Sequence, residues 1–554
     1  KSSGSGGVVM FVKIALTMIY VAITLYLGYR GWKETTVAKD YLIAGRSMGG
    51  FVMALSYGAT FISTSAIIGF GGAAALFGFS LLWLTFLNIF VGIFLAFVFF
   101  GSRVRRMGLA LDAHTFPELL GRRYQSRFLQ GFSGLVIFFF LPIYAGAVLI
   151  ALARLVEVYL GINYHVALLG CSFLVAAYVL TGGIKAVMYT DAFQGCVMFV
   201  VMAVFLVSTY YMCGGFINAH QTLTDMVQYY PETLKKGGMI GWTQGAAFGT
   251  PLWLTIYTTI VLGVGIGVLA QPQLAVRFMT IKSEAQLNRG VIYGGIFILC
   301  MTGVAFVVGA LTNVVFFKEY GFVEKVVDGV TKKIPQISVV VAGGNIDKII
   351  PMYIEKMFPD WFSTLFLLAM FAAAMSTLSA QYHAGGTSFG RDVYEKFLRG
   401  KGDTLLMTRI GVAATIVLTA LWGLALPESI VALATAFFFG LCSSSFLPVF
   451  VLGIYWRGVT WAGACASMVS GFTISSLYAL FIHQKEAVAI GLCKKMFGVD
   501  TLVSTYAPMS TIWKLQFVDQ NVIALPISFL IAIVVSLMTT KIDERHLDRC
   551  WKNF

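Results

Sequence analysis

Long apolar runs recur along almost the whole of this chain and limit what it can fold into. A helix of about 20 apolar residues crosses the hydrocarbon core of a lipid bilayer. Apolar residues make up 58% of the 554 positions and charged residues only 12%, whereas soluble domains carry roughly 25% charged residues. The chain is therefore expected to be an all-α polytopic protein of the inner (plasma) cell membrane, multi-pass, with the lipid bilayer as its surroundings.

Thirteen stretches have the length and composition of transmembrane helices. They are residues 8–28, 51–77, 81–100, 129–160, 166–180, 186–213, 246–270, 287–311, 361–390, 405–426, 431–455, 461–482 and 522–539. The opening KSSGSGG, residues 1–7, is expected to be an expression scar outside the fold.

The distribution of basic residues predicts the orientation of these spans. The net charge is +14, and 24 Lys and Arg fall in the connections of one side, against 12 in those of the other. Short cytoplasmic loops are enriched in Lys and Arg. We therefore expect the N-terminus outside and the C-terminus inside the cell. Because membrane topology accounts for the charge, no nucleic-acid partner is expected, and no obligate protein partner is predicted.

Sequence motifs of soluble and membrane-bound enzymes are missing. The chain has no G-x-x-x-x-G-K phosphate loop, no nucleophile elbow and no H-E-x-x-H metal motif. Its six His are dispersed, and its eight Cys have no metal-ligand spacing. An enzyme is therefore not expected.

Two of the apolar spans are interrupted by small and polar residues. Residues 54–78 read ALSYGATFISTSAIIGFGGAAALFG, and residues 261–273 read VLGVGIGVLAQPQ. Glycine and proline weaken a helix, and backbone groups freed in a membrane are tolerated where they line a cavity or bind a ligand. Interrupted spans at corresponding positions of two halves indicate a transporter built on inverted repeats, although glycine also serves close helix packing. We expect a leading helix at 8–31, a first repeat at 51–213, a second repeat at 246–455, and trailing helices at 461–554.

A later span, FAAAMSTLSAQYHAGG at 371–386, carries hydroxyls where apolar residues would suffice. Ser376, Thr377 and Ser379 would let helices approach closely or bond their own helix backbone. Alternatively, hydroxyls combined with freed carbonyls are hard oxygen ligands that suit a cation such as Na+. The pattern alone leaves both interpretations open.

Three segments resemble the sodium/solute symporter family, which includes bacterial pantothenate, proline and sialic acid carriers. They are DYLIAGRSMGGFVMALSYGATFISTSAIIG (40–69), GGIKAVMYTDAFQG (182–195) and AAAMSTLSAQ (372–381). The resemblance covers roughly residues 10–480. It implies a LeuT-like core of 5+5 helices in inverted repeats, with a leading helix and trailing helices.

The same resemblance implies a sodium site. In the family, two carbonyls of the first core helix and one carbonyl plus two hydroxyls of the eighth hold the ion. Matched by motif, these positions are Ala59, Ile62, Ala373, Ser376 and Thr377.

Some members bind a second sodium through the Asp of a TDxxQ segment and two hydroxyls on the eighth helix. Asp191 and Ser379 are present in this chain, but the next position is Ala380, which has no hydroxyl. Asp191 is therefore a candidate for a second sodium site, for a sodium exit relay, or for a helix cap.

The substrate is expected to be a small organic anion, which is a monocarboxylate such as acetate, lactate or pyruvate, or pantothenate. Proline carriers place an Asp where Phe61 stands, and sugar carriers place a polar residue where Ala66 stands. The remaining candidates offer hydroxyls, an amide and freed backbone without a fixed acid. These candidates are Ser63, Thr64, Ser65, Gly69, Tyr144, Gly265 and Gln271.

The sequence thus predicts a sodium-coupled symporter that works by alternating access, with Na+ as the coupling ion. Two alternatives stay open. One is a symporter of the same fold for an amino acid or other zwitterion. The other is a membrane sensor or channel that does not concentrate its ligand.

Overall fold

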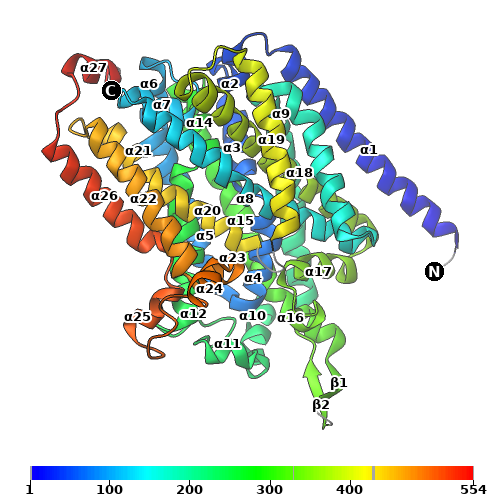
Figure 1. Ribbon diagram of the computed structural model, residues 1–554. Coiled ribbons are helices and arrows are strands. Elements are labelled where there is room, and N and C mark those ends of the chain that lie inside the picture. Colours follow the sequence, from blue (N-terminus) through cyan, green and yellow to red (C-terminus); the bar gives the residue numbers. More distant parts are fainter. Residues whose placement is uncertain (1–2, 328–329, 427–430, 553) are drawn as a thin grey trace.

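A computed structural model describes residues 3–327, 330–426, 431–552 and 554. All thirteen predicted spans fall on helices, and the first helix, α1 (Ser3–Lys33), begins before the first apolar run. Figure 1 shows α1 lying along one side of the bundle, with the C-terminus far from it.

The first half of the bundle follows α1 and opens with a short helix. Its helices are α2 (Ala38–Ile43), α3 (Gly50–Phe61), α4 (Phe70–Phe77), α5 (Leu82–Ile89), α6 (Ser102–Ala110), α7 (Phe116–Arg123), α8 (Arg127–Leu160) and α9 (Tyr164–Cys213). Wider helical turns at 65–69 lead into α4, and those at 90–101 continue α5.

The second half begins after an outer segment with two short helices, α10 (Phe216–Asp225) and α11 (Glu232–Lys236). Its helices are α12 (Pro251–Leu254), α13 (Val264–Gly267), α14 (Pro272–Thr280), α15 (Glu284–Tyr320), α18 (Asp360–Thr387), α19 (Thr404–Ala425), α20 (Val431–Ser445) and α21 (Leu447–Tyr455). Between α15 and α18 lie an antiparallel hairpin and two short helices, namely β1 (Phe322–Val327), β2 (Val330–Pro335), α16 (Ser338–Val341) and α17 (Ile349–Met357).

The last part of the chain packs beside the second half. It contains α22 (Trp461–Phe481), α23 (Gln484–Ile490), α24 (Leu492–Phe497), α25 (Thr511–Lys514), α26 (Gln520–Met538) and α27 (Glu544–Cys550).

The spans are regular except at a few bends. In the described residues, nine helices are long and apolar enough to cross a membrane, and α20 with α21 forms a further span bent by 42°. The predicted spans 166–180 and 186–213 belong to the single helix α9, which bends at Gly183 (φ 60°, ψ −171°). A Cβ at Gly183 would lie 2.6 Å from the Tyr41 ring, so the bend needs glycine both for its φ angle and for its packing.

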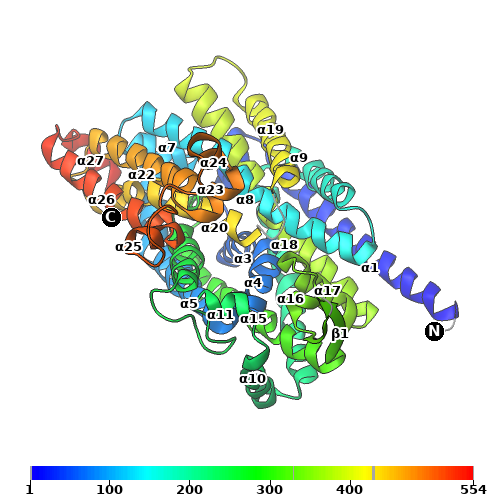
Figure 2. The same ribbon diagram turned by 60° about the horizontal axis from the view of Figure 1, so that its bottom comes forward.

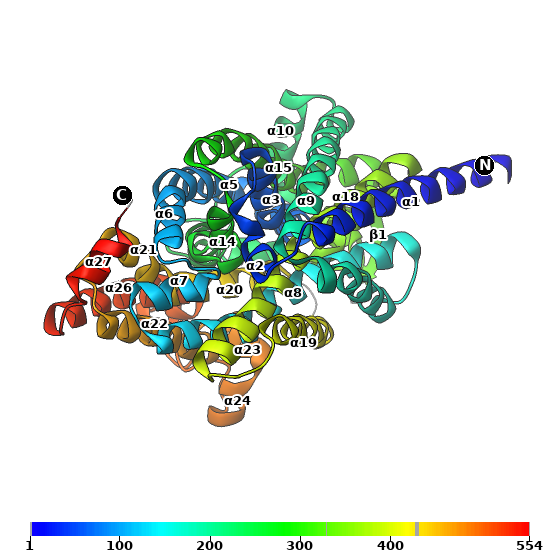
Figure 3. The same cartoon turned by 90° about the horizontal axis from the view of Figure 1, so that it is seen from above.

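The two ends of the bundle differ in what they carry. Figures 1 and 3 show α2, α6, α7, α14 and α27 together at one end, whereas Figure 2 brings forward the opposite end with the hairpin and α10, α11 and α25. The first end holds the basic connections, so the positive-inside rule places it in the cytoplasm. We call it the basic face.

Two arginines counted above as loop charges are buried instead. Arg123 in α7 and Arg277 in α14 are each 1% exposed. Arg123 donates to the carbonyls of Gly453 and Trp456, which explains why α7 packs onto α21. Arg277 lies deeper, beside the break described next.

Candidate functional site

The first interrupted span breaks where the sequence predicts it. Helix α3 ends at Phe61, and Ile62 takes an extended conformation (φ −89°, ψ 91°) before helical turns resume at Ser65. A break of this kind leaves carbonyls of the last turn of α3 without partners in their own helix. In a membrane such groups need other partners.

The partners come from α18, the helix that carries the hydroxyl-rich segment. Ser376 Oγ donates to Ala59 O at 2.9 Å and also contacts Ala373 O at 3.1 Å. Thr377 Oγ1 donates to Thr60 O at 3.1 Å and lies 3.4 Å from Ala59 O. Both hydroxyls are fully buried and face α3, not lipid.

Four of the five residues matched to a sodium site therefore meet at one junction. Ala59, Ala373, Ser376 and Thr377 contact one another there, and Ile62 is the residue at which α3 ends. We call this group the hydroxyl–carbonyl junction. Its oxygens are neutral and hard, the type that a monovalent cation can accept in place of water. Among the described residues, no group of three or more His, Cys, Asp and Glu offers an alternative metal site.

A buried ion pair lies directly beside this junction. Arg277 Nη2 is 2.9 Å from Asp191 Oδ2, and both side chains are almost fully buried. Ser56 Oγ donates to the same carboxylate oxygen at 2.7 Å and accepts a hydrogen bond from Arg277 Nε at 2.9 Å. Asp191 Oδ1 has no hydrogen-bond partner among the described residues.

Thr60 links the ion pair to the junction. Its hydroxyl lies 2.5 Å from Arg277 Nη2 and 3.3 Å from Asp191 Oδ2, while its carbonyl accepts from Thr377. Ser379, predicted together with Asp191 for a second sodium site or an exit relay, donates to Ser376 O at 3.1 Å. Asp191 is thus connected to the hydroxyl–carbonyl junction by the hydrogen bonds of Thr60. Ser379 is connected to it by its own hydrogen bond to the α18 backbone.

Sequence reasoning missed Arg277, Ser56 and Thr60. Arg277 follows a long apolar span and was counted with the loop charges, although it lies within a helix that starts at Pro272. Ser56 and Thr60 are four residues apart, so they share one face of α3. That spacing, together with an Arg in an otherwise apolar helix, was the available signal.

A small, partly enclosed cavity lies on the other side of the break. Three predicted substrate residues, Ser63, Ser65 and Tyr144, line it. The Ser63 and Ser65 hydroxyls are 2.5 Å apart, and the Tyr144 side chain lies close enough to interact with both. We call this space the neutral cavity, because none of the described residues that line it is charged.

The other four predicted substrate residues point elsewhere. Thr64 donates to Val148 O of α8 at 2.8 Å. Gly69 packs closely against α20, and Gly265 against α5, where a Cβ would lie 2.6 and 2.8 Å from the nearest side-chain atoms. Gln271 caps the second break and accepts from Gln273 Nε2 at 2.7 Å.

Three polar residues of the neutral cavity were not predicted. Thr302 and Thr435 donate to the backbone of their own helices. Asn88 on α5 is buried, and its Oδ1 has no hydrogen-bond partner in the described part of the chain. A buried amide oxygen of this kind is costly unless a ligand or water satisfies it.

A second small cavity lies toward the basic face. Arg277 and Gln273 line its inner part, and His114, Thr115 and Ser388 belong to the α7 and α18 ends of its lining. The Asp191–Arg277 pair thus lies between the junction and this cavity.

Comparisons with known proteins identify the family of this chain. The family model described as "Sodium:solute symporter family" matches residues 41–471. The chain is 29% identical to the sodium/pantothenate symporter of Haemophilus influenzae over 84% of its length and 89% of that protein. It is 27% identical to sodium/proline symporter 2 of Staphylococcus saprophyticus over 88% of its length and 89% of that protein.

A solved structure of a Na+-coupled sialic acid symporter superimposes with a TM-score of 0.71 at 17% identity, over 96% of this chain and 98% of that one. This likeness confirms the LeuT-like fold expected from the sequence. Because the family model covers most of the chain, the protein belongs to the sodium:solute symporter family and is a sodium-coupled membrane transporter of a small solute.

Proposed function

We propose that this protein imports a small organic anion, a monocarboxylate or pantothenate, together with sodium across the plasma membrane. The observation that carries the proposal is the pairing of the neutral cavity with the hydroxyl–carbonyl junction across a single helix break. The anion would occupy the neutral cavity, and the sodium ion would occupy the hydroxyl–carbonyl junction.

The proposed sodium ligands are the carbonyls of Ala59, Ile62 and Ala373 and the hydroxyls of Ser376 and Thr377. The two hydroxyls already point at carbonyls of the broken helix. A cation placed between them would replace these hydrogen bonds by ion–oxygen contacts to the same atoms. Sodium would then hold α18 against α3.

The substrate class follows from what the neutral cavity contains. Ser63, Ser65 and Tyr144 are hydroxyl donors, and freed N–H groups of a broken helix attract anionic groups. Among the described residues, no acidic side chain lines the cavity to hold an ammonium group. A carboxylate is therefore the best-matched ligand.

Coupling would follow from the shared helix break. Bound sodium orders the end of α3, whose next residues, Ser63 and Ser65, line the substrate cavity. Inward sodium movement supplies roughly 2.3 kcal/mol per charge per 100 mV of membrane potential, in addition to the concentration gradient. We further propose Asp191 as a relay for sodium leaving toward the cavity at the basic face, with Thr60 as the first contact on that route.

A zwitterion symporter is the second candidate function. It is favoured by the named relatives, which include sodium/proline symporters as well as sodium/pantothenate symporters. A zwitterion would need a counter-charge for its amine that the neutral cavity does not supply from its own lining.

The proposal is tested by thermal stabilisation of the purified protein. Acetate, lactate, pyruvate, pantothenate, proline and sialic acid are each added with sodium and with choline in its place. A ligand that binds only the folded state raises Tm by mass action. We expect a carboxylate to raise Tm only when sodium is present; a shift with proline alone would establish the second candidate.

Uptake into reconstituted vesicles separates a symporter from a sensor or channel. An imposed inward sodium gradient should drive the identified ligand above its external concentration. Equilibration without accumulation would contradict symport.

A further inference from the structure

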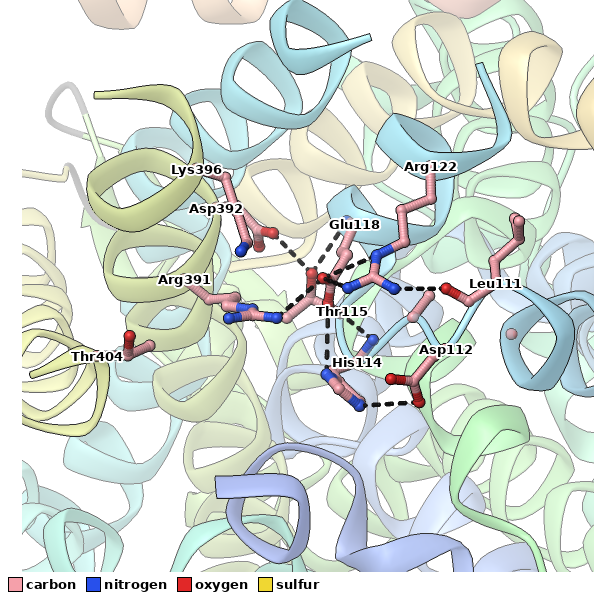
Figure 4. A network of polar contacts seen from close by, with 12 residues as sticks. Leu111, Asp112, His114, Thr115, Glu118, Arg122, Arg391, Asp392, Lys396 and Thr404 are labelled. Atoms are coloured by element: carbon pink, nitrogen blue, oxygen red, sulfur yellow. Dashed lines mark hydrogen bonds and ion pairs between the residues drawn. The ribbon is translucent and has the colours of Figure 1, made fainter. Parts of the chain in front are cut away.

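An open pocket at the basic face brings together cations from three separate parts of the chain. Its volume is about 450 Å³. Its polar lining includes Glu118 and Arg122 of α7, Arg127 of α8, Lys396 of the segment after α18, and His546 and Arg549 of α27. Figure 4 shows Glu118, Arg122 and Lys396 in the network of polar contacts around Glu118. We call it the basic pocket.

The acid in the basic pocket is already engaged. Glu118, whose side chain is 1% exposed, accepts from Arg122 at 2.6 Å and from Arg391 at 3.1 Å. It also accepts from the His114 backbone N–H at 2.9 Å. The single carboxylate of Glu118 therefore pairs with two guanidinium groups. It does not pair with the remaining cations of the basic pocket.

Two other acids near the basic pocket are paired with cations other than Arg127 and Arg549. Glu395 lies 2.5 Å from Arg391 and 2.6 Å from Lys396. Asp548, next to Arg549 in sequence, lies 2.5 Å from Arg457. Burial lowers the pKa of His114, so its ring adds no positive charge at neutral pH. Arg127 and Arg549 give the pocket an excess of positive charge that these acids do not cancel.

Apolar side chains are exposed immediately beside these cations. Phe128, the neighbour of Arg127, is 43% exposed, and Leu398, two residues after Lys396, is 65% exposed. Phe397 packs against α8 at Gly131, where a Cβ would lie 2.3 Å from its ring. The pocket thus combines a cationic hollow with an apolar border at the start of a membrane-spanning helix.

We propose that the basic pocket binds the headgroup of an anionic phospholipid of the cytoplasmic leaflet, with its acyl chains along Phe128 and Leu398. Basic residues are common on this face of any membrane protein, but here they converge on one hollow from α7, α8, the end of α18 and α27. Basic pockets at the cytoplasmic ends of spans suit lipid phosphates. Arginine is well matched to phosphate because its donors form a planar fork. A soluble phosphate would leave the apolar border without a role.

A lipid bound in the basic pocket would contact helix ends from both halves of the bundle. Arg391 and Glu118 join the end of α18 to α7, and Asp392 beside them accepts from Thr115 at 2.8 Å and from Gln130 at 2.8 Å. Thr115 also lines the cavity at the basic face. A headgroup in the basic pocket would form a further connection between α7 and the end of α18.

The test compares two matched double variants of the full chain. R127Q/R549Q removes two charges from the basic pocket, while the control K282Q/R289Q removes two exposed charges from the start of α15 on the same face. Delipidated protein is titrated with phosphatidylglycerol or phosphatidylcholine, and bound lipid is counted by native mass spectrometry. We expect wild type and control to prefer phosphatidylglycerol, and the pocket variant to bind it roughly tenfold or more weakly.

Several outcomes would overturn the proposal. Equal phosphatidylglycerol binding by both double variants would exclude the basic pocket as the site. Displacement of the lipid by millimolar inorganic phosphate or glycerol phosphate in wild type, but not in R127Q/R549Q, would show that the occupant is a soluble anion. Equal Tm values in phosphatidylcholine confirm that the variants are folded. Should the double variant not fold, R127Q alone, which changes an exposed side chain, must still lower phosphatidylglycerol binding.

Discussion

The break after α3 separates two polar regions that differ in charge. Toward the basic face lie the hydroxyl–carbonyl junction and the Asp191–Arg277 pair, in which every charged group has a partner of opposite charge. Beyond the break lies the neutral cavity, with hydroxyls, the Asn88 amide and aromatic rings. Only a few residues of one chain segment separate the two regions.

This difference in charge indicates that the two regions have different roles. A buried ion pair is costly to break, because removal of one partner leaves the other charge uncompensated. Such a pair fixes α3, α9 and α14 relative to one another. Among the described residues, the neutral cavity has no comparable ion pair, and the unsatisfied oxygen of Asn88 is available to a ligand. Stability should therefore depend on the first region and substrate choice on the second.

The largest expected effect is on stability. R277Q leaves the Asp191 carboxylate buried without its counter-charge, which typically costs about 3–5 kcal/mol. The expected result is a large fall in Tm in detergent, measured without substrate. R277Q combined with D191N removes both charges and should recover most of that loss. A double variant as unstable as R277Q would show that the pair does not act through charge compensation.

The next effect concerns sodium. S376A removes a hydroxyl that would coordinate the ion, and contacts to charged groups contribute roughly 1.5–3 kcal/mol. The sodium concentration for half-maximal uptake should rise by about tenfold or more. S363A is the matched control, because Ser363 lies in the same helix and contacts the Ile354 and Pro359 carbonyls. Unchanged sodium dependence in S376A would refute the assigned site.

The sequence predicted the architecture well, because a bilayer demands long apolar helices and these are visible as runs of apolar residues. It also placed the first break, since FISTS and the following glycines interrupt such a run. It did not predict that Arg277 is buried, because its partner Asp191 is distant in sequence and a single Arg after a span resembles a loop charge. It grouped Ser63, Thr64 and Ser65 together, although Thr64 faces α8 while its neighbours line the cavity.

Charge placed in the neutral cavity sharpens the comparison and decides between the two substrate classes. N88D introduces a carboxylate beside the proposed anion, and like charges at close range repel. Carboxylate affinity should fall by roughly tenfold, measured as the concentration for half-maximal thermal stabilisation at saturating sodium. N88S, which stays neutral, is the control. Improved binding of proline by N88D, with no loss of carboxylate binding, would overturn the anion assignment.

The smallest expected effect comes from a single hydroxyl. Y144F removes one donor next to Ser63 and Ser65 but keeps the ring that packs against Phe438 and Phe439. One neutral hydrogen bond contributes about 1 kcal/mol, or roughly fivefold in affinity. The KM for the carboxylate should rise by that factor while sodium dependence stays as in wild type. If Y144F instead shifted sodium dependence as strongly as S376A, the neutral cavity and the hydroxyl–carbonyl junction would have to be treated as one site, since a group on the far side of the break would then be contributing directly to ion binding.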